Sequence, residues 1–267
     1  PRDMNSLIKQ LKNTRAHIIT GVDTLFSAMM KHTGFSNLDF SKLKLTLSGG
    51  MSVQRSTAER WHAITGKPII EAYGLTEASP AITTNPVNSP GYTGTIGLPL
   101  PLTEVSIRDA DGKPVGTNTP GELWARGPQV MHGYWNKPEE TAAVLTEDGW
   151  LKTGDIVTQD EQGYLQVIDR KKDLIIISGF NVYPSEIEDV LCSHPEVSEA
   201  GVVGIGSNGG SETIKAVIVR NDSGLTKEQV ADYCRENLAA YKIPKIIEFT
   251  DQLPKSNIGK ILRRALR

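Results

Sequence analysis

The sequence of 267 residues contains little cysteine, almost no surplus charge and no long apolar run that is free of proline and glycine. Its two cysteines, Cys192 and Cys234, each fall in a stretch with a helical pattern, so a disulfide framework is not expected. The longest uncharged run, residues 78–103, holds five prolines and three glycines, a composition unsuited to a membrane span. These absences favour a soluble protein of a reducing compartment, and we expect a cytoplasmic location.

Two classes of site are also disfavoured. Basic residues (29) do not outnumber acidic residues (31), so nucleic acid is not an expected partner. The five histidines have no metal-ligand spacing, so no zinc-type site is expected. The run from Gly204 to Gly209 matches the dinucleotide-binding fingerprint, but the β-branched residues after it indicate a strand where that fingerprint requires a helix. We interpret it as a hairpin loop.

The first 80 residues alternate between helical and strand patterns. We expect helices at 7–11, 24–31 and 56–65, and strands at 16–20, 43–47 and 69–72. Strands and helices that alternate at this spacing predict an α/β architecture with mostly parallel strands.

The pattern changes after residue 80. Residues 81–168 are predicted to form a β-rich subdomain, because glycine or proline recurs every few residues and Asp111-Gly112 is a hairpin signal. Its expected elements are strands at 105–108, 122–125, 150–152 and 164–168, and one helix at 138–145.

Residues 169–267 are predicted to form a small α+β domain, which begins with the charged segment 169–173. Two sequences in it have the pattern of a helix-capping box, Ser185-x-x-Glu188 and Thr226-x-x-Gln229. A very apolar stretch, 174–177, follows the charged segment, and strands are expected at 199–204 and 213–220. The predicted boundary therefore separates 1–168 from 169–267.

Two short motifs in the first 80 residues could bind a nucleotide. Gly49 and Gly50 follow a strand and precede a helix, where glycines let backbone amides approach a phosphate, although a tight βα turn needs small residues in any case. The run Tyr73-Gly-Leu-Thr76-Glu77 offers an aromatic face, a hydroxyl and a carboxylate, which suit a purine, a phosphate oxygen and Mg²⁺. A polar turn with an exposed glutamate is the alternative.

Three charged residues further along could serve the same ligand. Asp155 ends the run Lys-Thr-Gly-Asp, and a carboxylate there can hold both hydroxyls of a ribose or cap its own turn. Arg170 stands at the predicted domain border, where its fork could bind a ribose or a phosphate, although a solvated surface arginine is the commoner case. Lys260 follows Gly259 in a basic C-terminal segment and could direct one ammonium at a phosphate, although a solvated basic surface is the commoner case.

These motifs occur together, in one order, in one superfamily. Tyr73–Glu77, Gly133-Tyr-Trp135, the run that ends at Asp155, Asp169-Arg-Lys-Lys-Asp173 and Lys255–Lys260 resemble the successive core motifs of adenylate-forming enzymes, which include acyl-CoA synthetases, peptide-synthetase adenylation domains and luciferases. Within that superfamily, the stretch from Asp148 to Lys172 is similar to the signature of fatty acyl-CoA synthetases. The resemblance covers essentially the whole chain.

The resemblance implies ATP-dependent activation of a long-chain fatty acid to acyl-AMP and then to acyl-CoA, with Mg²⁺ as the metal and coenzyme A as the co-substrate. The residues that it implies are Gly49, Gly50 and Tyr73 for adenine, Thr76 for the α-phosphate, Glu77 for Mg²⁺, Asp155 and Arg170 for the ribose, Lys172 as the hinge of the small domain, Gly179 for the pantetheine tunnel, and Lys260 for the carboxylate and α-phosphate during adenylation.

One expected motif is missing. The superfamily carries a Ser/Thr/Gly-rich phosphate loop that ends in Pro-Lys-Gly, upstream of every motif seen here, and this sequence has neither that loop nor a Walker pattern. The sequence also begins at Pro1 rather than Met. We therefore interpret it as a C-terminal portion that comprises the end of the large domain, a β-barrel-like subdomain and the lid, and we expect negligible ligase turnover from this chain alone.

Two alternatives remain open at this point. The acid could be an aryl or medium-chain acid, or the chain could be a non-catalytic module that binds a nucleotide or a protein. The presence of Glu77, Asp155 and Lys260 together argues against the second, because a non-catalytic module needs none of them. The fatty substrate and the basic segment 255–267 also suggest a peripheral contact with the inner membrane.

Overall fold

The computed structural model describes residues 3–206, 212–221, 224–256 and 259–267. The chain divides into two compact units. The large unit comprises Pro1–Thr153 and Val157–Val167, and the small unit comprises Gly154–Ile156 and Ile168–Arg267. In the part of the chain that is described, no helix has the length and apolar composition needed to cross a membrane.

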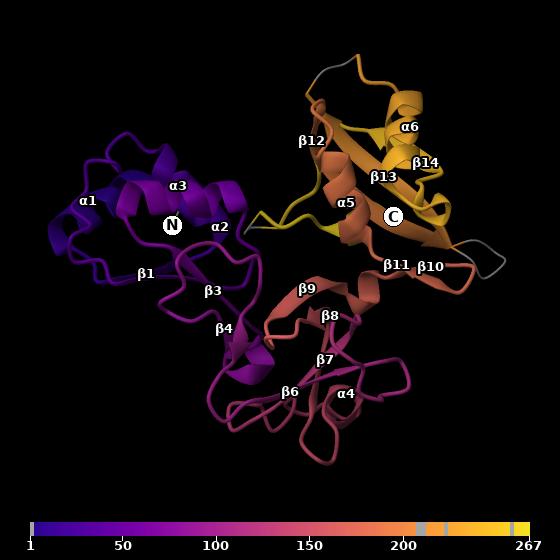
Figure 1. Ribbon diagram of the computed structural model, residues 1–267, viewed down its shortest axis with the longest axis horizontal. Coiled ribbons are helices and arrows are strands. Elements are labelled where there is room, and N and C mark those ends of the chain that lie inside the picture. The colour runs from indigo at the N-terminus through magenta and orange to yellow at the C-terminus, as the bar shows by residue number, and fades with distance from the viewer. Residues whose placement is uncertain (1–2, 207–211, 222–223, 257–258) are drawn as a thin grey trace. The chain divides into compact units, whose positions relative to one another are not determined.

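The large unit contains a five-stranded sheet with the order β1-β2-β3-β4-β5 (Figure 1). The first three strands pair in parallel and the last two are antiparallel, which confirms the predicted α/β layer. The strands are β1 (Ile18–Gly21), β2 (Leu45–Ser48), β3 (Ile69–Gly74), β4 (Ala81–Thr84) and β5 (Leu98–Pro99). The helices between them are α1 (Met4–Thr14), α2 (Asp23–Lys31) and α3 (Arg55–Thr65).

Aromatic side chains fill the core between these helices and the sheet. Trp61 of α3 is fully buried, and its ring centroid lies 4.8 Å from that of Phe26 and 5.2 Å from that of Phe35. Its indole Nε1 donates a hydrogen bond of 3.1 Å to Oγ1 of Thr46 in β2. Trp61 thus bonds a helix to the strand that leads into the Gly49–Gly50 turn.

The predicted β-rich subdomain contains an open four-stranded sheet with the order β6-β7-β8-β9. Its elements are β6 (Glu104–Arg108), β7 (Gly121–Arg126), β8 (Leu151–Gln159), β9 (Leu165–Arg170) and the helix α4 (Pro138–Val144). Cationic and aromatic side chains alternate over β6, β7 and residues 150–152. The Arg108 guanidinium lies 4.3 Å from the Trp124 ring centroid and 5.0 Å from that of Trp150. Such contacts stabilise a partly exposed sheet face.

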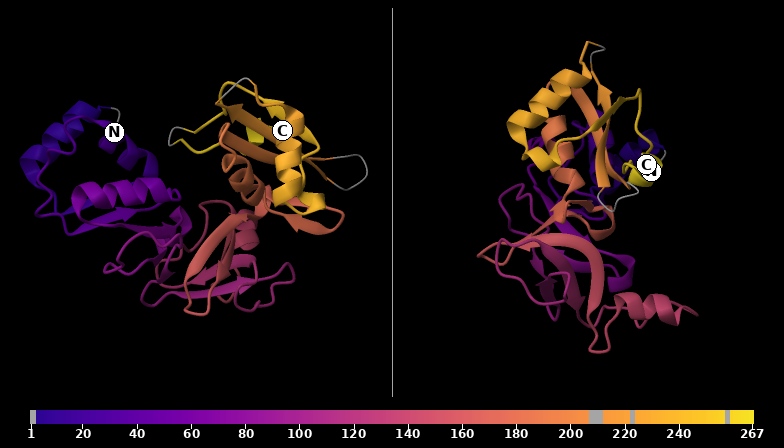
Figure 2. Two further views of the ribbon diagram at one scale, coloured as in Figure 1. Left: turned by 45° about the horizontal axis from the view of Figure 1, so that its top comes forward. Right: turned by 90° about the vertical axis from the view of Figure 1, so that its right-hand side faces the viewer.

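The small unit packs helices on a three-stranded sheet with the order β12-β13-β14 (Figures 1 and 2). β12 and β13 are antiparallel, whereas β13 and β14 are parallel. The elements of this unit are the hairpin strands β10 (Ile175–Ile177) and β11 (Phe180–Val182), the helices α5 (Pro184–Cys192) and α6 (Lys227–Asn237), and the strands β12 (Val197–Gly206), β13 (Glu212–Arg220) and β14 (Ile246–Phe249). Both cysteines lie in helices and are free thiols.

The fingerprint-like run beginning at Gly204 joins two antiparallel strands, because β12 ends at Gly206 and β13 begins at Glu212. No helix begins at Glu212, as the hairpin interpretation predicts, and residues 207–211 lie outside the described residues.

One of the two predicted capping boxes is correct and the other is wrong. Thr226 caps α6, and its Oγ1 and the Gln229 side chain exchange hydrogen bonds with each other's backbone N–H. At α5 the helix begins at Pro184, so Ser185 is already helical and cannot be the N-cap. The N-cap is Tyr183, which makes no side-chain cap bond. Ser185 and Glu188 bond to Arg263 instead.

Candidate functional site

The first group of predicted residues lies where the parallel strands of the large unit end. Gly49 and Gly50 directly follow β2, and Tyr73 lies near the end of the neighbouring strand β3. Both glycines are exposed, and Gly50 has a φ of +83°, a conformation that favours glycine. Ligands of open α/β sheets bind at this carboxyl edge. The fold therefore brings these three residues to the edge where a nucleotide is expected.

A buried hydroxyl at the same edge was not identified from the sequence. Ser48 is 1% exposed, and its Oγ has no hydrogen-bond partner among the described residues. A buried polar group without a partner costs about 1–3 kcal/mol. Only the fold shows this, because the sequence cannot reveal which hydroxyls become buried.

Glu77 is held by a loop that is distant in the sequence. It belongs to the short 3₁₀ helix η1 (Thr76–Ala78), in which Thr76 is exposed. Its Oε1 accepts a hydrogen bond of 2.8 Å from the Tyr134 hydroxyl, and its backbone oxygen accepts one of 2.8 Å from the Met131 N–H. The bond to the carboxylate raises the pKa of Tyr134. Tyr134 stands in the Gly133-Tyr-Trp135 motif, but the motif alone does not indicate its partner.

The carboxylate oxygens of Glu77 fit a Mg²⁺ ion that the phosphates of a substrate also bind. Within the described ranges, no group of three or more histidine, cysteine, aspartate and glutamate side chains could hold a metal ion. Mg²⁺ is commonly bound by one or two carboxylates together with phosphate oxygens and water. A single oriented carboxylate such as that of Glu77 therefore matches an ion that arrives with a nucleotide.

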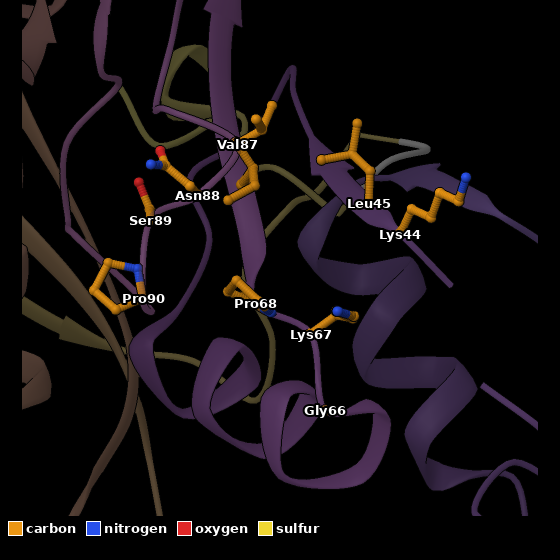
Figure 3. A pocket seen from close by; sticks show the side chains of 10 residues that line it. Lys44, Leu45, Gly66, Lys67, Pro68, Val87, Asn88, Ser89 and Pro90 are labelled. Atoms are coloured by element: carbon orange, nitrogen blue, oxygen red, sulfur yellow. The ribbon is translucent and has the colours of Figure 1, made fainter. Parts of the chain in front are cut away.

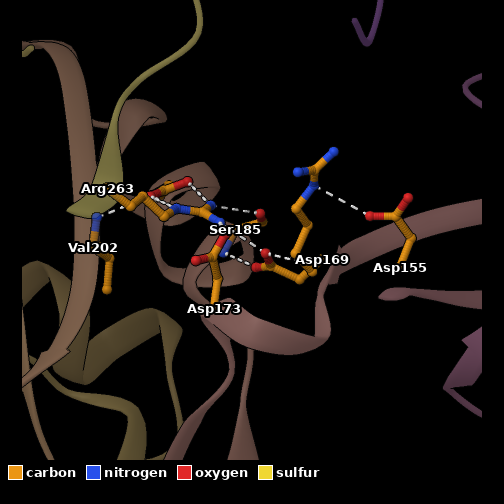
Figure 4. Close-up of polar contacts among 8 residues, drawn as sticks. Asp155, Asp169, Asp173, Ser185, Val202 and Arg263 are labelled. Atoms are coloured by element: carbon orange, nitrogen blue, oxygen red, sulfur yellow. Dashed lines mark hydrogen bonds and ion pairs between the residues drawn. The ribbon is translucent and has the colours of Figure 1, made fainter. Parts of the chain in front are cut away.

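The second group of predicted residues lies in the small unit, which includes Gly154–Ile156 of β8. Nε of Arg170 lies 3.3 Å from Oδ1 of Asp155, as the dashed line in Figure 4 marks. The Asp155 side chain is largely buried and that of Arg170 is half-exposed. The pair presents one acceptor and one donor group side by side, which is what recognition of a ribose requires.

Lys260 belongs to the same unit, and the charges of this pair act on its pKa. Loss of hydration and the positive charge of Arg170 lower the pKa of Lys260, and the negative charge of Asp155 acts in the opposite direction. Its backbone oxygen accepts a hydrogen bond of 2.8 Å from the Ser256 N–H. The fold thus gathers Asp155, Arg170 and Lys260, which are dispersed over more than 100 positions of the sequence, into one unit.

The remaining two predicted residues lie at turns of the small unit. Lys172 is exposed in the 3₁₀ helix η2 (Lys171–Asp173). Gly179 has a φ of +86° in the two-residue turn between β10 and β11, where Ser178 also has a positive φ. A Cβ at Gly179 would meet no atom within 4 Å, so its backbone, rather than crowding, favours glycine there.

Arg263 forms a polar cluster that sequence reasoning did not identify. Its guanidinium donates hydrogen bonds to Asp169, Asp173, Ser185 and Glu188, which Figure 4 shows converging on one point. Burial opposes its charged form, but the bonds and charges of Glu188 and Asp169 outweigh that cost and raise the pKa of Arg263. We call these five residues the Arg263 cluster.

The large unit also contains a pocket of about 230 Å³ (Figure 3). It is lined by Lys44 and Leu45 at the start of β2, by Lys67 and Pro68 before β3, and by the loop 87–90. It therefore lies at the amino ends of the parallel strands, opposite to the edge where ligands of such sheets bind. None of the predicted site residues lines this pocket.

The chain is similar to known enzymes along its full length. A family profile described as "AMP-binding enzyme" matches residues 1–135, and one described as "AMP-binding enzyme C-terminal domain" matches residues 186–260. A long-chain-fatty-acid–CoA ligase of Yersinia pestis is 53% identical over 100% of this chain and 47% of its own length. A feruloyl-CoA synthase of an Amycolatopsis species is 37% identical over 99% of this chain and 54% of its own length.

The solved structures agree with the sequence comparison. The crystal structure of ATP-bound MatB from Rhodopseudomonas palustris matches with a TM-score of 0.87 and 32% identity, over 99% of this chain and 52% of that chain. This chain spans about half the length of the curated relatives it matches. Because the AMP-binding profile matches half of the chain and the second profile matches the small unit, the chain belongs to the family of AMP-binding enzymes.

Proposed function

We propose that the chain provides the lid and part of the nucleotide site of an ATP-dependent acid–CoA ligase that activates a long-chain fatty acid. The observation that supports this most directly is the Asp155–Arg170 ion pair, because its unit also contains Lys260, on whose pKa both charges act. The names of the relatives, above all the long-chain-fatty-acid–CoA ligases at about half identity, support the substrate class.

The proposed reaction has two steps. A carboxylate oxygen of the fatty acid attacks the α-phosphorus of ATP, which gives acyl-AMP and releases pyrophosphate. The sulfur of coenzyme A then attacks the acyl carbon, AMP leaves with its phosphate oxygen, and the thiol proton is released. Activation is needed because a free carboxylate is a poor acceptor for a thiol.

Residues of the large unit would bind the nucleotide. Gly49, Gly50 and Tyr73 would line the adenine pocket at the edge of the sheet. Thr76 would contact the α-phosphate, and Glu77, oriented by Tyr134, would hold Mg²⁺. When bound, the ion would neutralise phosphate charge that builds up during adenylation.

Residues of the small unit would complete the site. Asp155 would accept hydrogen bonds from the ribose hydroxyls and Arg170 would donate one to a ribose oxygen. The Lys260 ammonium would bridge the attacking carboxylate and the α-phosphate and stabilise the charge of the transition state. Its lowered pKa matches a partly dehydrated ammonium.

The two remaining residues would serve the movement of the lid and the binding of coenzyme A. Acyl-AMP hydrolyses if water enters, so a lid that turns between the two half-reactions is expected. Lys172, in the exposed turn η2, would be the hinge. Gly179, at the tip of the β10–β11 hairpin, would line the tunnel for the pantetheine of coenzyme A.

The test uses the complete gene product and separates the half-reactions. Adenylation is followed by palmitate-dependent exchange of labelled pyrophosphate into ATP, and thioester formation is followed from preformed palmitoyl-AMP and coenzyme A. Lys260→Ala is expected to slow adenylation by about 100-fold or more, which corresponds to about 3 kcal/mol, and to change thioester formation by less than about threefold. Lys255→Gln, at a lysine paired with Glu199 in the same segment, is the control. Equal loss of both half-reactions would contradict the role of Lys260.

A second substrate candidate follows from the feruloyl-CoA synthase among the relatives. Palmitate, a medium-chain acid and ferulate are compared as substrates under identical conditions. A value of kcat/KM for ferulate above that for palmitate would replace the fatty acid by an aryl acid and leave the adenylation chemistry unchanged. The absence of adenylation with every acid would favour a non-catalytic module.

We propose that any membrane contact is peripheral and electrostatic. Five basic residues lie in the segment 255–267, but Lys255 pairs with Glu199 and Arg263 is held inside its cluster. Lys260, Arg264 and Arg267 are the exposed basic residues that remain in this segment. Flotation with anionic liposomes at low salt tests the contact, and recovery of the protein only in the unbound fraction would contradict it.

A further inference from the structure

The Arg263 guanidinium joins three elements of the small unit. Nη1 donates to Oδ1 of Asp169 in β9 at 2.8 Å and to Oδ2 of Asp173 in η2 at 3.4 Å. Nη2 donates to Ser185 Oγ at 2.9 Å, and Nε and Nη2 donate to the two oxygens of Glu188 at 3.0 and 2.6 Å, both residues of α5. The side chain is 17% exposed.

Two of the acceptors, Asp169 and Glu188, also have partners other than Arg263. Asp169, whose side chain is 1% exposed, also accepts hydrogen bonds from the backbone N–H groups of Arg170 and Ser185. Glu188 Oε1 also accepts one from the backbone N–H of Val202 in β12. The carboxylates therefore form a fixed receptor, and a planar fork with several donors is the side chain that fits it.

Lys260 and Arg263 belong to one folded-back segment. The Leu262 N–H bonds to the Pro254 oxygen at 2.8 Å, and the Ser256 N–H bonds to the Lys260 oxygen at 2.8 Å. Beyond Arg263, Leu266 is buried in an apolar cluster with Leu253. The apolar contacts hold the two ends of the segment on the sheet, whereas Arg263 connects it to η2 and α5.

Two members of the Arg263 cluster also act on the charge of Lys260, and a third, Asp169, directly precedes Arg170. Besides Arg170 and Asp155, its ammonium interacts with the charges of Arg263 and Asp173, the second of which is also an Arg263 acceptor. A shift of the segment relative to η2 would therefore move Lys260 away from Arg170 and Asp155 together.

We propose that Arg263 is a positioning residue for Lys260: by bonding to Asp169, Asp173, Ser185 and Glu188, it holds the segment that follows Lys260 against η2 and α5, and so directs the ammonium toward the Asp155–Arg170 pair. The structural part of the proposal concerns the small unit alone, and its consequence for catalysis rests on the proposed adenylation reaction. Arg263 does not contact the substrate in this role.

The structural test is amide hydrogen exchange of this chain, followed in the peptide that covers residues 259–267. Arg263→Gln is expected to speed exchange there by at least about tenfold, because it removes the ionic anchor. Arg264→Gln is the matched control, because Arg264 is the adjacent arginine and is exposed. It is expected to change exchange by less than about twofold. Equal exchange in wild type and Arg263→Gln would overturn the anchoring.

The catalytic test is a double-mutant cycle in the complete gene product. With Lys260 present, Arg263→Gln is expected to slow adenylation by about tenfold or more, and Arg263→Lys by a similar factor because an ammonium lacks the fork. In the Lys260→Ala background, the same substitution is expected to cost less than about threefold, because the residue it positions is gone. Equal losses in both backgrounds would show that Arg263 acts only on stability, and would overturn the positioning role.

Two further outcomes are distinguishable. If Arg263→Gln does not fold, Ser185→Ala removes one acceptor and keeps every charge of the cluster, and the same two measurements apply to it. If the wild-type protein forms no acyl-AMP, the proposed function fails. Hydrogen exchange then still decides whether Arg263 anchors the segment.

Discussion

Arg263 donates hydrogen bonds to both carboxylate oxygens of Glu188, at 3.0 Å from Nε to Oε1 and at 2.6 Å from Nη2 to Oε2. The two residues are 75 positions apart in the sequence. Their side chains are 17% and 16% exposed, so the pair is largely shielded from water. Loss of one partner from such a pair leaves the other charge inadequately compensated.

Glu188→Gln is therefore expected to lower the free energy of unfolding of the small unit by about 2–4 kcal/mol. Exchange of the buried amides of β12 and β13 measures this change. The control is Asp232→Asn, which removes an exposed ion pair with Arg235 on α6 and is expected to cost about 1 kcal/mol or less. Equal effects of the two substitutions would mean that the Glu188 pair is no stronger than a surface pair.

The same pair shows where sequence patterns succeed and where they fail. The individual helix and strand patterns of the first 80 residues and the capping box at Thr226 depend on neighbours within a few positions, so the sequence suffices for them. Ser185 and Glu188 have an equally good local pattern, but Pro184 begins the helix and a distant arginine takes both side chains. A local pattern cannot anticipate a partner 75 positions away.

The candidate site, too, is predicted only in part by local patterns. The motifs indicate which residue types serve a nucleotide, and the fold groups Asp155, Arg170 and Lys260 in one unit. The partners of those residues are not evident from the motifs, because contacts such as Tyr134–Glu77 span 57 positions. Burial of Ser48 depends in turn on packing of the whole sheet edge.

Thr46 and Ser48 provide a matched pair for testing that buried hydroxyl, because both are buried on β2 and point to the same face. Thr46→Val leaves Trp61 Nε1 without its acceptor and is expected to cost about 1–3 kcal/mol. Ser48→Ala removes a group that has no partner among the described residues, so it is expected to be neutral or to stabilise by up to about 1 kcal/mol.

Urea unfolding followed by tryptophan fluorescence measures both effects, since all four tryptophans belong to the large unit. A loss above about 1 kcal/mol for Ser48→Ala would contradict the unpartnered state of this hydroxyl and would point to a bound water in the pocket of Ser48.

The buried carboxyl of Glu71 is expected to make the stability of the large unit depend on pH. Burial raises its pKa from the ordinary value of 4.5 to about 7, although hydrogen bonds from the Val53 and Gly94 backbone oppose the shift and the nearby Asp23 charge adds to it. The folded state therefore binds this proton more tightly than the unfolded state. The contribution of protonated Glu71 to stability is fully present below pH 4.5, falls as the pH rises toward 7 and is lost above it.

The difference in unfolding free energy between Glu71→Gln and wild type isolates this contribution. The unfolding free energy of the variant relative to that of the wild type is expected to rise by up to about 3 kcal/mol from pH 4.5 to pH 7. Above that range the difference is expected to be constant. Tryptophan fluorescence in urea at several pH values measures it. A difference that does not change with pH would show that Glu71 titrates alike in the folded and unfolded states.

Tyr134→Phe tests how Glu77 is oriented, and its functional readout rests on the proposed adenylation. The hydroxyl fixes one oxygen of the carboxylate at 2.8 Å, so its removal leaves the second oxygen less well directed toward Mg²⁺. Groups that orient a metal ligand typically change metal affinity by 10–100-fold, and we expect a rise of about tenfold in the Mg²⁺ concentration for half-maximal adenylation. Tyr164→Phe is the control, since the described structure records no hydrogen bond from its hydroxyl. If Tyr134→Phe changes only the KM for palmitate, Tyr134 orients the acid rather than the metal ligand.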